Sequence, residues 1–481
     1  MAYFHGVKAS EVATSIITPV ATNAGLPVVF GTAPVHLTDD PTAYVNKPVI
    51  CYSYKEAVAA LGYSADWENY TLCEAMYSEF QLFGVQPIIF VNVLDPAKHK
   101  EDVESSEVAV SAKVAKVAAP VLLSTLVVKA SAAAQPATLD VDYTAAFNDD
   151  GELIITMLDD GALASATSVF LDYTKLDPSA VTDSDVIGGV DLDGNSTGLE
   201  LLNSIYTMFS MVPGLVAAPG WSEHPSVASV MKAKALVINN LFRCIVLTDV
   251  DTSTVKKYSD VNVWKNNNSY TSPNQVVCWP MVKNGDAIFH LSTQLMGLIG
   301  KLDAANDDVP YQSPSNQDLN ATGLCLADGT EVILTLEQAN LLNSQGVYTA
   351  INRGGWKGWG NYTGAYPTNT DVKDSFIAVR RMFDWNAQTF ILTYWQKVDQ
   401  PLTRRLVKSI VDSEQIRLNG LVSRGYMLGA AVKFLEDENP TTDLLQGIIR
   451  IHSYITPPVP AQCIENIEEY DVDNFTALFS D

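Results

Sequence analysis

Residues 26–31 read LPVVFG, and residues 86–94 read QPIIFVNVL. Short, uninterrupted apolar runs of this kind are typical of strands that are buried on both faces. Two segments between these runs, beginning at Ser53 and Thr71, carry the capping-box pattern, in which a hydroxyl residue is followed three positions later by glutamate. The second of these predicted helices ends at Gly84. This strand–helix–strand order predicts an α/β fold with a largely parallel sheet.

The same pattern resumes in the second half of the chain. A helix is expected to begin at Pro225, because proline suits the first helical position, and Ser222 is expected to cap it. Another capping box begins at Thr335. The expected elements are strands over 214–218, 244–248 and 347–352 and helices over 225–240 and 335–345, with a glycine- and tryptophan-rich loop over 353–360.

Between these two parts, residues 96–198 have the texture of an all-β module inserted into the α/β domain. Alternating apolar segments over 123–130, 139–143 and 153–157 are separated by Asp-Gly pairs at 150–151 and 160–161. Asp-Gly between alternating segments is a strong hairpin signal, because both turn positions favour positive φ. A further segment over 191–195 (DLDGN) resembles the start of a calcium loop, but its glycine is fourth instead of sixth, so we predict a plain turn.

The last hundred residues predict an α+β domain. Two long helices, 373–396 and 402–419, are expected to be separated at Pro401, and strands are expected over 446–455 and 461–469. Both ends of the chain read as extended arms. Such arms can add a strand to the sheet of a neighbouring subunit, while simple fraying remains the alternative. The residues expected to make these contacts are Ser15, Ile16, Ile17, Thr18, Val20, Val472, Phe475, Leu478 and Phe479.

The chain of 481 residues, about three domains by length, has a net charge of −25 that is unevenly distributed. Residues 101–200 carry four lysines and eighteen acidic residues, a net −14, and residues 453–481 carry six acidic residues and no basic ones. Residues 401–433 reverse the sign to +4. An acidic surface disfavours nucleic acid and anionic lipid. The basic stretch either contacts an acidic partner or forms ion pairs within the chain, and its cations are Arg404, Arg405, Lys408, Arg417, Arg424 and Lys433.

Motifs for catalysis, metals and cofactors are weak throughout. The six cysteines and six histidines are dispersed, so we expect buried thiols, no metal site and no cofactor. The turn over 220–224 (GWSEH) stands where a nucleophile elbow would, but it lacks the second glycine. A divergent α/β hydrolase using Ser222 and His224, a nucleotide-binding enzyme and a monomeric adhesin-like protein remain alternatives. No apolar run approaches the ~18 residues of a membrane span, and no secretory signal is visible, which favours a soluble protein made in the cytosol.

The order of several motifs resembles that of contractile tail sheath proteins, which occur in bacteriophages with contractile tails and in R-type bacteriocins. The resemblance runs over nearly the whole chain, with only the 96–198 module being generic. Its most characteristic part is 376–384 (FIAVRRMFD). The other matching segments are 25–33 (GLPVVFGTA), 215–220 (LVAAPG), 336–347 (LEQANLLNSQGV) and the Trp359-Gly360 loop.

This resemblance implies a non-enzymatic subunit that polymerises as stacked hexameric rings around a tail tube and contracts. Its implied partners are other copies of the chain, the tube protein, and baseplate and tail terminator proteins. It implies assembly in the host bacterial cytoplasm into a virion tail or bacteriocin particle. The implied domains are an N-terminal arm (1–25), a subtilisin-like central domain without a catalytic triad (26–95 and 199–370), an inserted β-sandwich (96–198), a tube-facing C-terminal domain (371–470) and a C-terminal arm (471–481).

Overall fold

An eight-stranded sheet forms the centre of the molecule in the computed structural model, which describes residues 24–479. The order of its strands is β2-β3-β1-β12-β13-β14-β19-β20. All neighbouring pairs are parallel except those made by the two edge strands. The predicted α/β class with a largely parallel sheet is therefore confirmed. The strands are β1 (Pro27–Gly31), β2 (Val49–Cys51), β3 (Ile88–Asn92), β12 (Leu215–Ala217), β13 (Ile245–Asp249), β14 (Gln275–Cys278), β19 (Val347–Asn352) and β20 (Trp356–Trp359).

Helices surround this sheet, and most of them share one apolar core with it, while the helices Tyr258–Asn267 and Leu336–Asn343 pack in a second apolar cluster. The helix α2 runs on into a π-helical stretch, η2. It is η2 that packs against α7, which also contacts β12 and β13. The elements are α1 (Tyr54–Leu61), α2 (Thr71–Met76), η2 (Tyr77–Phe83), α5 (Pro225–Leu236), α6 (Tyr258–Asn267), α7 (Leu291–Ala305) and α8 (Leu336–Asn343).

The hydrogen bonds at the helix N-termini test the capping boxes that the sequence predicts. The hydroxyl of Thr335 accepts a hydrogen bond from the Gln338 amide, and the Gln338 side chain accepts one from the Thr335 amide, as a capping box requires. Ser53 also caps its helix, although the Glu56 carboxylate accepts from the amide of Tyr52. The capping box predicted at Thr71 is wrong, because this hydroxyl accepts from the amide of Thr32 instead.

The segment 353–360 is a second correction to the sequence prediction. It forms a hairpin, since β20 pairs antiparallel with β19, whereas a loop was expected. The structure also has a small antiparallel sheet that sequence patterns did not indicate. Its strands are β15 (Met281–Asn284), β16 (Ala287–Phe289), β17 (Gly323–Cys325) and β18 (Glu331–Val332), in the order β16-β15-β17-β18.

Strands between residues 100 and 176 form two antiparallel three-stranded sheets, β4-β9-β6 and β5-β8-β7, which share one apolar core. The predicted Asp-Gly turn at 150–151 joins β7 to β8, with Gly151 at a φ of 79°. The strand predicted over 139–143 is wrong, because β7 begins only at its last residue. The strands are β4 (Lys100–Ala109), β5 (Val114–Val117), β6 (Val127–Lys129), β7 (Tyr143–Phe147), β8 (Leu153–Met157) and β9 (Ser168–Leu176).

Short elements lead from these sheets back to the central one. They are α3 (Asp183–Ile187), β10 (Gly189–Val190), β11 (Ser196–Thr197) and α4 (Ile205–Phe209). Residues 191–195 form the turn between β10 and β11, as predicted, with the Gly194 amide donating to the Asp191 carbonyl.

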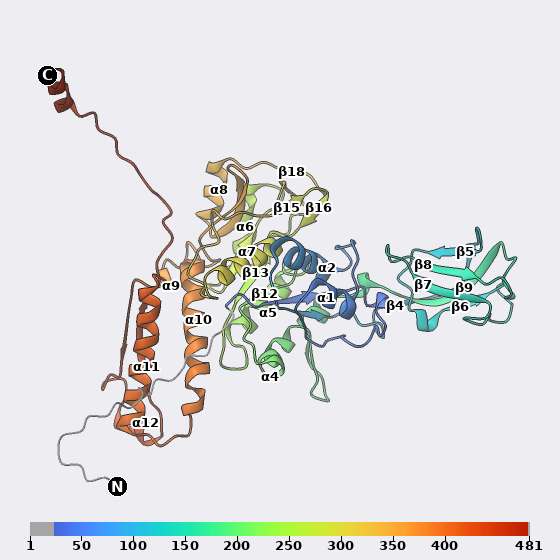
Figure 1. The fold of residues 1–481 in the computed structure, drawn as a ribbon, viewed down its shortest axis with the longest axis horizontal. Coiled ribbons are helices and arrows are strands. Elements are labelled where there is room, and N and C mark those ends of the chain that lie inside the picture. The colour runs from blue at the N-terminus through green and yellow to red at the C-terminus, as the bar shows by residue number, and fades with distance from the viewer. Residues whose placement is uncertain (1–23, 480–481) are drawn as a thin grey trace, which may run out of the picture.

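Two long helices lie side by side in the C-terminal part of the chain, with the predicted break between them at Pro401. The strand predicted over 446–455 reduces to β22, which pairs with a strand that the sequence did not indicate, β21. Figure 1 shows α11 and the β4–β9 sheets at opposite ends of the long axis. The elements are α9 (Val372–Ser375), α10 (Ile377–Tyr394), α11 (Arg404–Ser423), β21 (Gly429–Lys433), α12 (Thr441–Leu445) and β22 (His452–Thr456).

Five of the six cysteines are buried, as expected of small apolar side chains, whereas Cys463 is exposed against expectation. In the described part of the chain, no helix has both the length and the hydropathy needed to cross a membrane.

Candidate functional site

Two adjacent arginines of α10, Arg380 and Arg381, lie at the junction between the long helices and the central sheet. Their side chains are 6% and 4% exposed, respectively. Arginine is almost never fully buried unless it is paired. Since successive helical residues are rotated by about 100°, the two side chains reach different parts of the molecule. They belong to the 376–384 segment that is the most characteristic part of the family resemblance.

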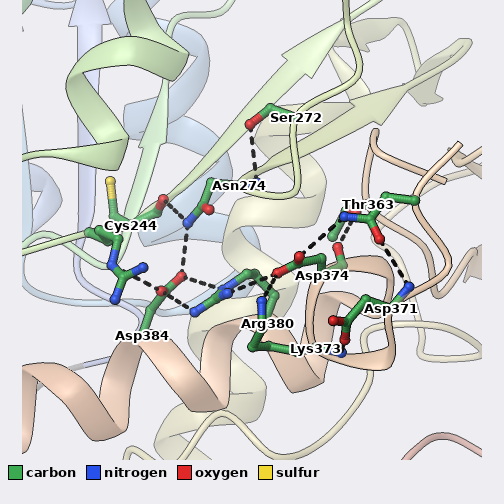
Figure 2. Close-up of polar contacts among 11 residues, drawn as sticks. Cys244, Ser272, Asn274, Thr363, Asp371, Lys373, Asp374, Arg380 and Asp384 are labelled. Atoms are coloured by element: carbon green, nitrogen blue, oxygen red, sulfur yellow. Dashed lines mark hydrogen bonds and ion pairs between the residues drawn. The ribbon is translucent and has the colours of Figure 1, made fainter. Parts of the chain in front are cut away.

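Arg380 joins α10 to the beginnings of two central strands. Its Nη2 donates to Asp384 Oδ1 at 2.8 Å, and its Nη1 donates to Asp374 Oδ1 at 3.2 Å. Figure 2 shows the network continuing from Asp384 to Asn274, whose amide donates to Asp384 Oδ2 at 2.9 Å and to the Cys244 carbonyl at 3.1 Å. Asn274 precedes β14 and Cys244 precedes β13, so the network holds α10 against this end of the sheet.

Arg381 makes a separate set of bonds. It forms a two-pronged ion pair with Asp303 of α7, in which Nη1 donates to Oδ1 at 3.0 Å and Nη2 donates to Oδ2. The same Nη2 donates to the backbone carbonyl of Ala24 at 3.0 Å. The Asp303 side chain is 3% exposed, so the whole arrangement is buried. Burial acts to raise the pKa of Asp303, and the guanidinium acts against that rise.

The basic residues predicted to contact a tube do not form one surface. Arg404, Arg405 and Lys408 are exposed at the start of α11, and Lys408 pairs with Asp412 at 3.0 Å. Arg417 is a correction to the prediction, because its side chain is only 7% exposed and pairs with the fully buried Glu414. This burial leaves Arg417 unable to contact a partner in this conformation.

The two remaining basic residues lie outside the helix face that carries Arg404. Arg424 pairs with Asp307 at 3.4 Å, and Lys433 on β21 lies 5.3 Å from the ring centroid of Tyr454. The reading as ion pairs within the chain therefore holds for part of the stretch, and contact with an acidic partner stays a prediction for the rest. Arg417, Arg424 and the Lys408–Asp412 pair form ion pairs within the chain, while Arg404 and Arg405 have no ion-pair partner in residues 24–479.

Of the predicted arm residues, those at the N-terminus (Ser15, Ile16, Ile17, Thr18 and Val20) lie outside the described residues. At the other end, Val472 and Phe475 are 66% and 55% exposed. They belong to a short 3₁₀ helix, η7 (Val472–Phe479), whose bounds also include Leu478 and Phe479. The prediction that the described part of 471–481 is extended is therefore wrong.

The strand predicted over 461–469 is also absent from the described structure. This segment has no strand partner and lies exposed, with Ile464 and Ile467 among its most exposed side chains. A strand needs a partner to satisfy its backbone groups, and no strand within residues 24–479 pairs with this segment. Figure 1 shows it leaving the body of the molecule beyond α9 and ending in η7.

The turn at 220–224 does not have the geometry of a nucleophile elbow. Ser222 is fully buried and donates its hydroxyl to the Asp249 carboxylate at 3.2 Å. His224 contacts Asp183, at 2.6 Å, and not Ser222. The expectation that Ser222 caps α5 is wrong as well, because His224 occupies the N-cap position and makes no side-chain cap.

A cavity of about 780 Å³ lies beside this turn and is lined by residues that include Glu74, Glu223 and His290. Glu74 is almost fully buried and accepts hydrogen bonds from the amide and the Nδ1 of His290, each at 2.8 Å. Burial lowers the pKa of His290, but the Glu74 carboxylate outweighs that effect, and the pKa rises to about 10. The cavity is therefore flanked by an internal ion pair whose groups already satisfy each other.

Asp303 and Asn274 were missed by sequence reasoning. Each is a single polar residue whose partner on α10 lies far along the chain, so local patterns carry no signal for it. The one available signal was on α10 itself, where Arg380, Arg381 and Asp384 are the only charged residues of a largely buried helix. A charge on the core side of a helix requires a buried partner.

The chain is similar to known proteins both in sequence and in fold. No family model matches it. The chain is 27% identical over 473 residues to the tail sheath protein of Burkholderia phage BcepMu, covering 96% of this chain and 95% of that protein. Its fold is similar to that of a chain in the contracted sheath complex of the extracellular contractile injection system PVC, with a TM-score of 0.58, 12% identity and coverage of 98% and 99%.

A chain in the baseplate structure of the anti-feeding prophage has the same TM-score of 0.58, at 15% identity and with coverage of 98% and 100%. These likenesses show the fold, and the phage relative shows a similarity in sequence over 96% of the chain. The predicted resemblance to contractile tail sheath proteins is therefore confirmed along nearly the whole chain.

Proposed function

We propose that this chain is the structural subunit of a contractile tail sheath. It polymerises as stacked hexameric rings around a tail tube and contracts to drive the tube through the envelope of a target cell. The observation that carries this proposal is the similarity to a tail sheath protein over 96% of the chain, without a large unmatched part in either protein. The enzyme alternative has no such support, and Ser222 is buried against a carboxylate.

The domains take their roles from their positions along the molecule. We assign 26–95 and 199–370 to a subtilisin-like central domain without a triad, 96–198 to an outward-facing sandwich and 371–470 to the tube-facing domain. The arms, 1–25 and 471–481, link neighbouring subunits. The separation of α11 from the β4–β9 sheets in Figure 1 supports the assignment, since the basic and the most acidic regions lie at opposite ends.

Contraction on this proposal needs no nucleotide, because the energy is stored when the sheath is assembled in its extended state. Subunits then move as nearly rigid bodies into a shorter and wider lattice. The buried bonds of Arg380 support rigid-body motion, since they tie the tube-facing helices to the central sheet. The partners are other copies of the chain, the tube protein, and baseplate and terminator proteins, in a particle assembled in the host cytoplasm.

Negative-stain electron microscopy of the purified protein tests the proposal. The expected result is tubular polymers built from stacked rings, formed without any added nucleotide or metal. Particles that stay monomeric at every protein concentration, with and without tail tubes, would contradict it.

A further inference from the structure

The residue at which the N-terminal arm joins the body, Ala24, is held between three elements. Its carbonyl accepts from Arg381 of α10, which is itself held by Asp303 of α7. Its side chain is 5% exposed and packs in the apolar cluster of α10, α11 and β21. Three residues later, the chain enters β1 in the middle of the central sheet.

The backbone on either side of the Ala24–Gly25 bond lies close to its neighbours. A Cβ on Gly214 would lie 1.9 Å from the Ala24 carbonyl oxygen. A Cβ on Gly25 would lie 2.9 Å from Asp303 Oδ2 and 3.2 Å from the Cα of Gly300. Glycine at 214 and 25 therefore lets the chain pass close to both β12 and α7. We call Ala24, Gly25, Gly214, Asp303 and Arg381 the arm junction.

We propose that Arg381 is a positioning residue for sheath assembly, which fixes the direction in which the N-terminal arm leaves the subunit by holding the Ala24 carbonyl. The inference rests on the proposed sheath function. An arm that must reach a defined site on a neighbour is useful only if its starting direction is the same in every subunit. Preorganising that direction avoids the ordering cost at the moment of association.

Two matched substitutions can distinguish this positioning role of Arg381 from a purely structural one. Arginine presents a planar fork of donors, whereas lysine presents one compact charge. Arg381→Lys can keep the charge opposite Asp303 but loses the planar fork with which Arg381 bonds both Asp303 oxygens while it holds the Ala24 carbonyl. The matched control is Arg380→Lys on the same helix, because Arg380 is equally buried and bonds Asp374 and Asp384 but no residue of the arm junction.

The experiment measures thermal unfolding and polymer formation for the full-length protein and both variants. We expect similar decreases in Tm for the two variants, with polymers formed by Arg380→Lys and lost or irregular for Arg381→Lys at the same concentration. Equal polymer formation by both folded variants would overturn the inference. Failure of the unmodified chain to polymerise would instead overturn the proposed function.

A second variant keeps the test decisive if Arg381→Lys does not fold. Gly214→Ala leaves Arg381 and Asp303 intact but displaces the Ala24 carbonyl, so it should also lose regular polymers while remaining folded. If both variants unfold under conditions in which Arg380→Lys is folded, the arm junction serves the stability of the subunit, and the inference is overturned.

Discussion

At the scale of single residues, two classes of buried ionisable group can be distinguished in the described part of the chain. Arg380, Arg381 and Arg417 each have a carboxylate partner, and removing one member of such a pair costs about 3–5 kcal/mol because the other is left uncompensated. Glu79 on η2 belongs to the second class. It is fully buried against Gly297 of α7, and neither of its carboxylate oxygens has a hydrogen-bond partner of good geometry among the described residues.

Burial raises the pKa of Glu79 well above its ordinary value of 4.5. In the unfolded chain the group ionises near pH 4.5, while the folded protein retains the proton. Its contribution to stability is therefore complete below that pH and is lost as the pH rises toward the folded-state pKa, by about 1.4 kcal/mol per pH unit. We predict that Glu79→Gln, which is neutral at every pH, raises the free energy of unfolding at pH 8 but has little effect at pH 5.

Urea unfolding at the two pH values measures this difference. Glu337→Gln, the same change at an exposed position on α8, serves as the control and should alter stability equally little at both. A Glu79→Gln effect that is the same at pH 5 and pH 8 would show that Glu79 is ionised in the folded protein.

At the scale of elements, the sequence predicted local structures correctly where they depend only on residues close along the chain. The capping box at Thr335, the turn at Gly151 and the break at Pro401 depend on residues within a few positions, and the structure has all three. The box at Thr71 failed because a residue 39 positions away, Thr32, bonds the hydroxyl. Tertiary partners of this kind are invisible in a local pattern.

In the candidate site, too, a local segment could be predicted from sequence, whereas its distant partners could not. The segment 376–384 was identifiable from sequence, but Arg381 bonds Asp303 and Ala24, which are 78 and 357 positions away. Arg417 was predicted to lie on a surface because the net charge of a segment does not distinguish exposed cations from buried ones. It is buried beside Asn386 of α10, and Glu414, three positions earlier on α11, compensates its charge.

The exposed cations of α11 carry a prediction that belongs to this element. If Arg404 and Lys408 contact an acidic tube in the extended state, then Arg404→Glu with Lys408→Glu should weaken assembly on purified tubes and reduce its sensitivity to salt. Partly exposed ion pairs are each worth about 0.2–1 kcal/mol, which suits contacts that must break on contraction. Sedimentation of sheath with tubes over a salt series measures the effect.

The control for this pair makes the same change in net charge elsewhere on the surface. Lys55→Glu with Lys257→Glu alters two exposed lysines on the central part of the molecule, far along the chain from α11. The tube-contact proposal fails if the α11 variant co-sediments with tubes as the unmodified protein does, with unchanged salt dependence.

At the scale of the whole molecule, the apolar cores do not depend on the two ends of the chain. The central sheet, the β4–β9 sheets and the C-terminal helices each have an apolar core made from residues between Ala24, which belongs to the last of these cores, and residue 456. The segment from 457 to 475 instead exposes Ile464, Ile467, Tyr470, Val472 and Phe475. Apolar side chains along an unpartnered segment lose favourable burial unless another molecule covers them.

We therefore predict that deleting residues 1–20 or 472–481 leaves folded, soluble monomers that do not form sheaths. Folding should persist because neither deletion removes a residue of those cores, so Tm should change little. Assembly should be lost because each arm supplies a contact that another subunit needs. Size-exclusion chromatography and negative-stain microscopy measure both outcomes, and Val472→Asp with Phe475→Asp tests the C-terminal contact without shortening the chain. Regular contracted tubes from both deletion variants would rule out the linking role of the arms, because a mesh of shared strands cannot form from subunits that lack them.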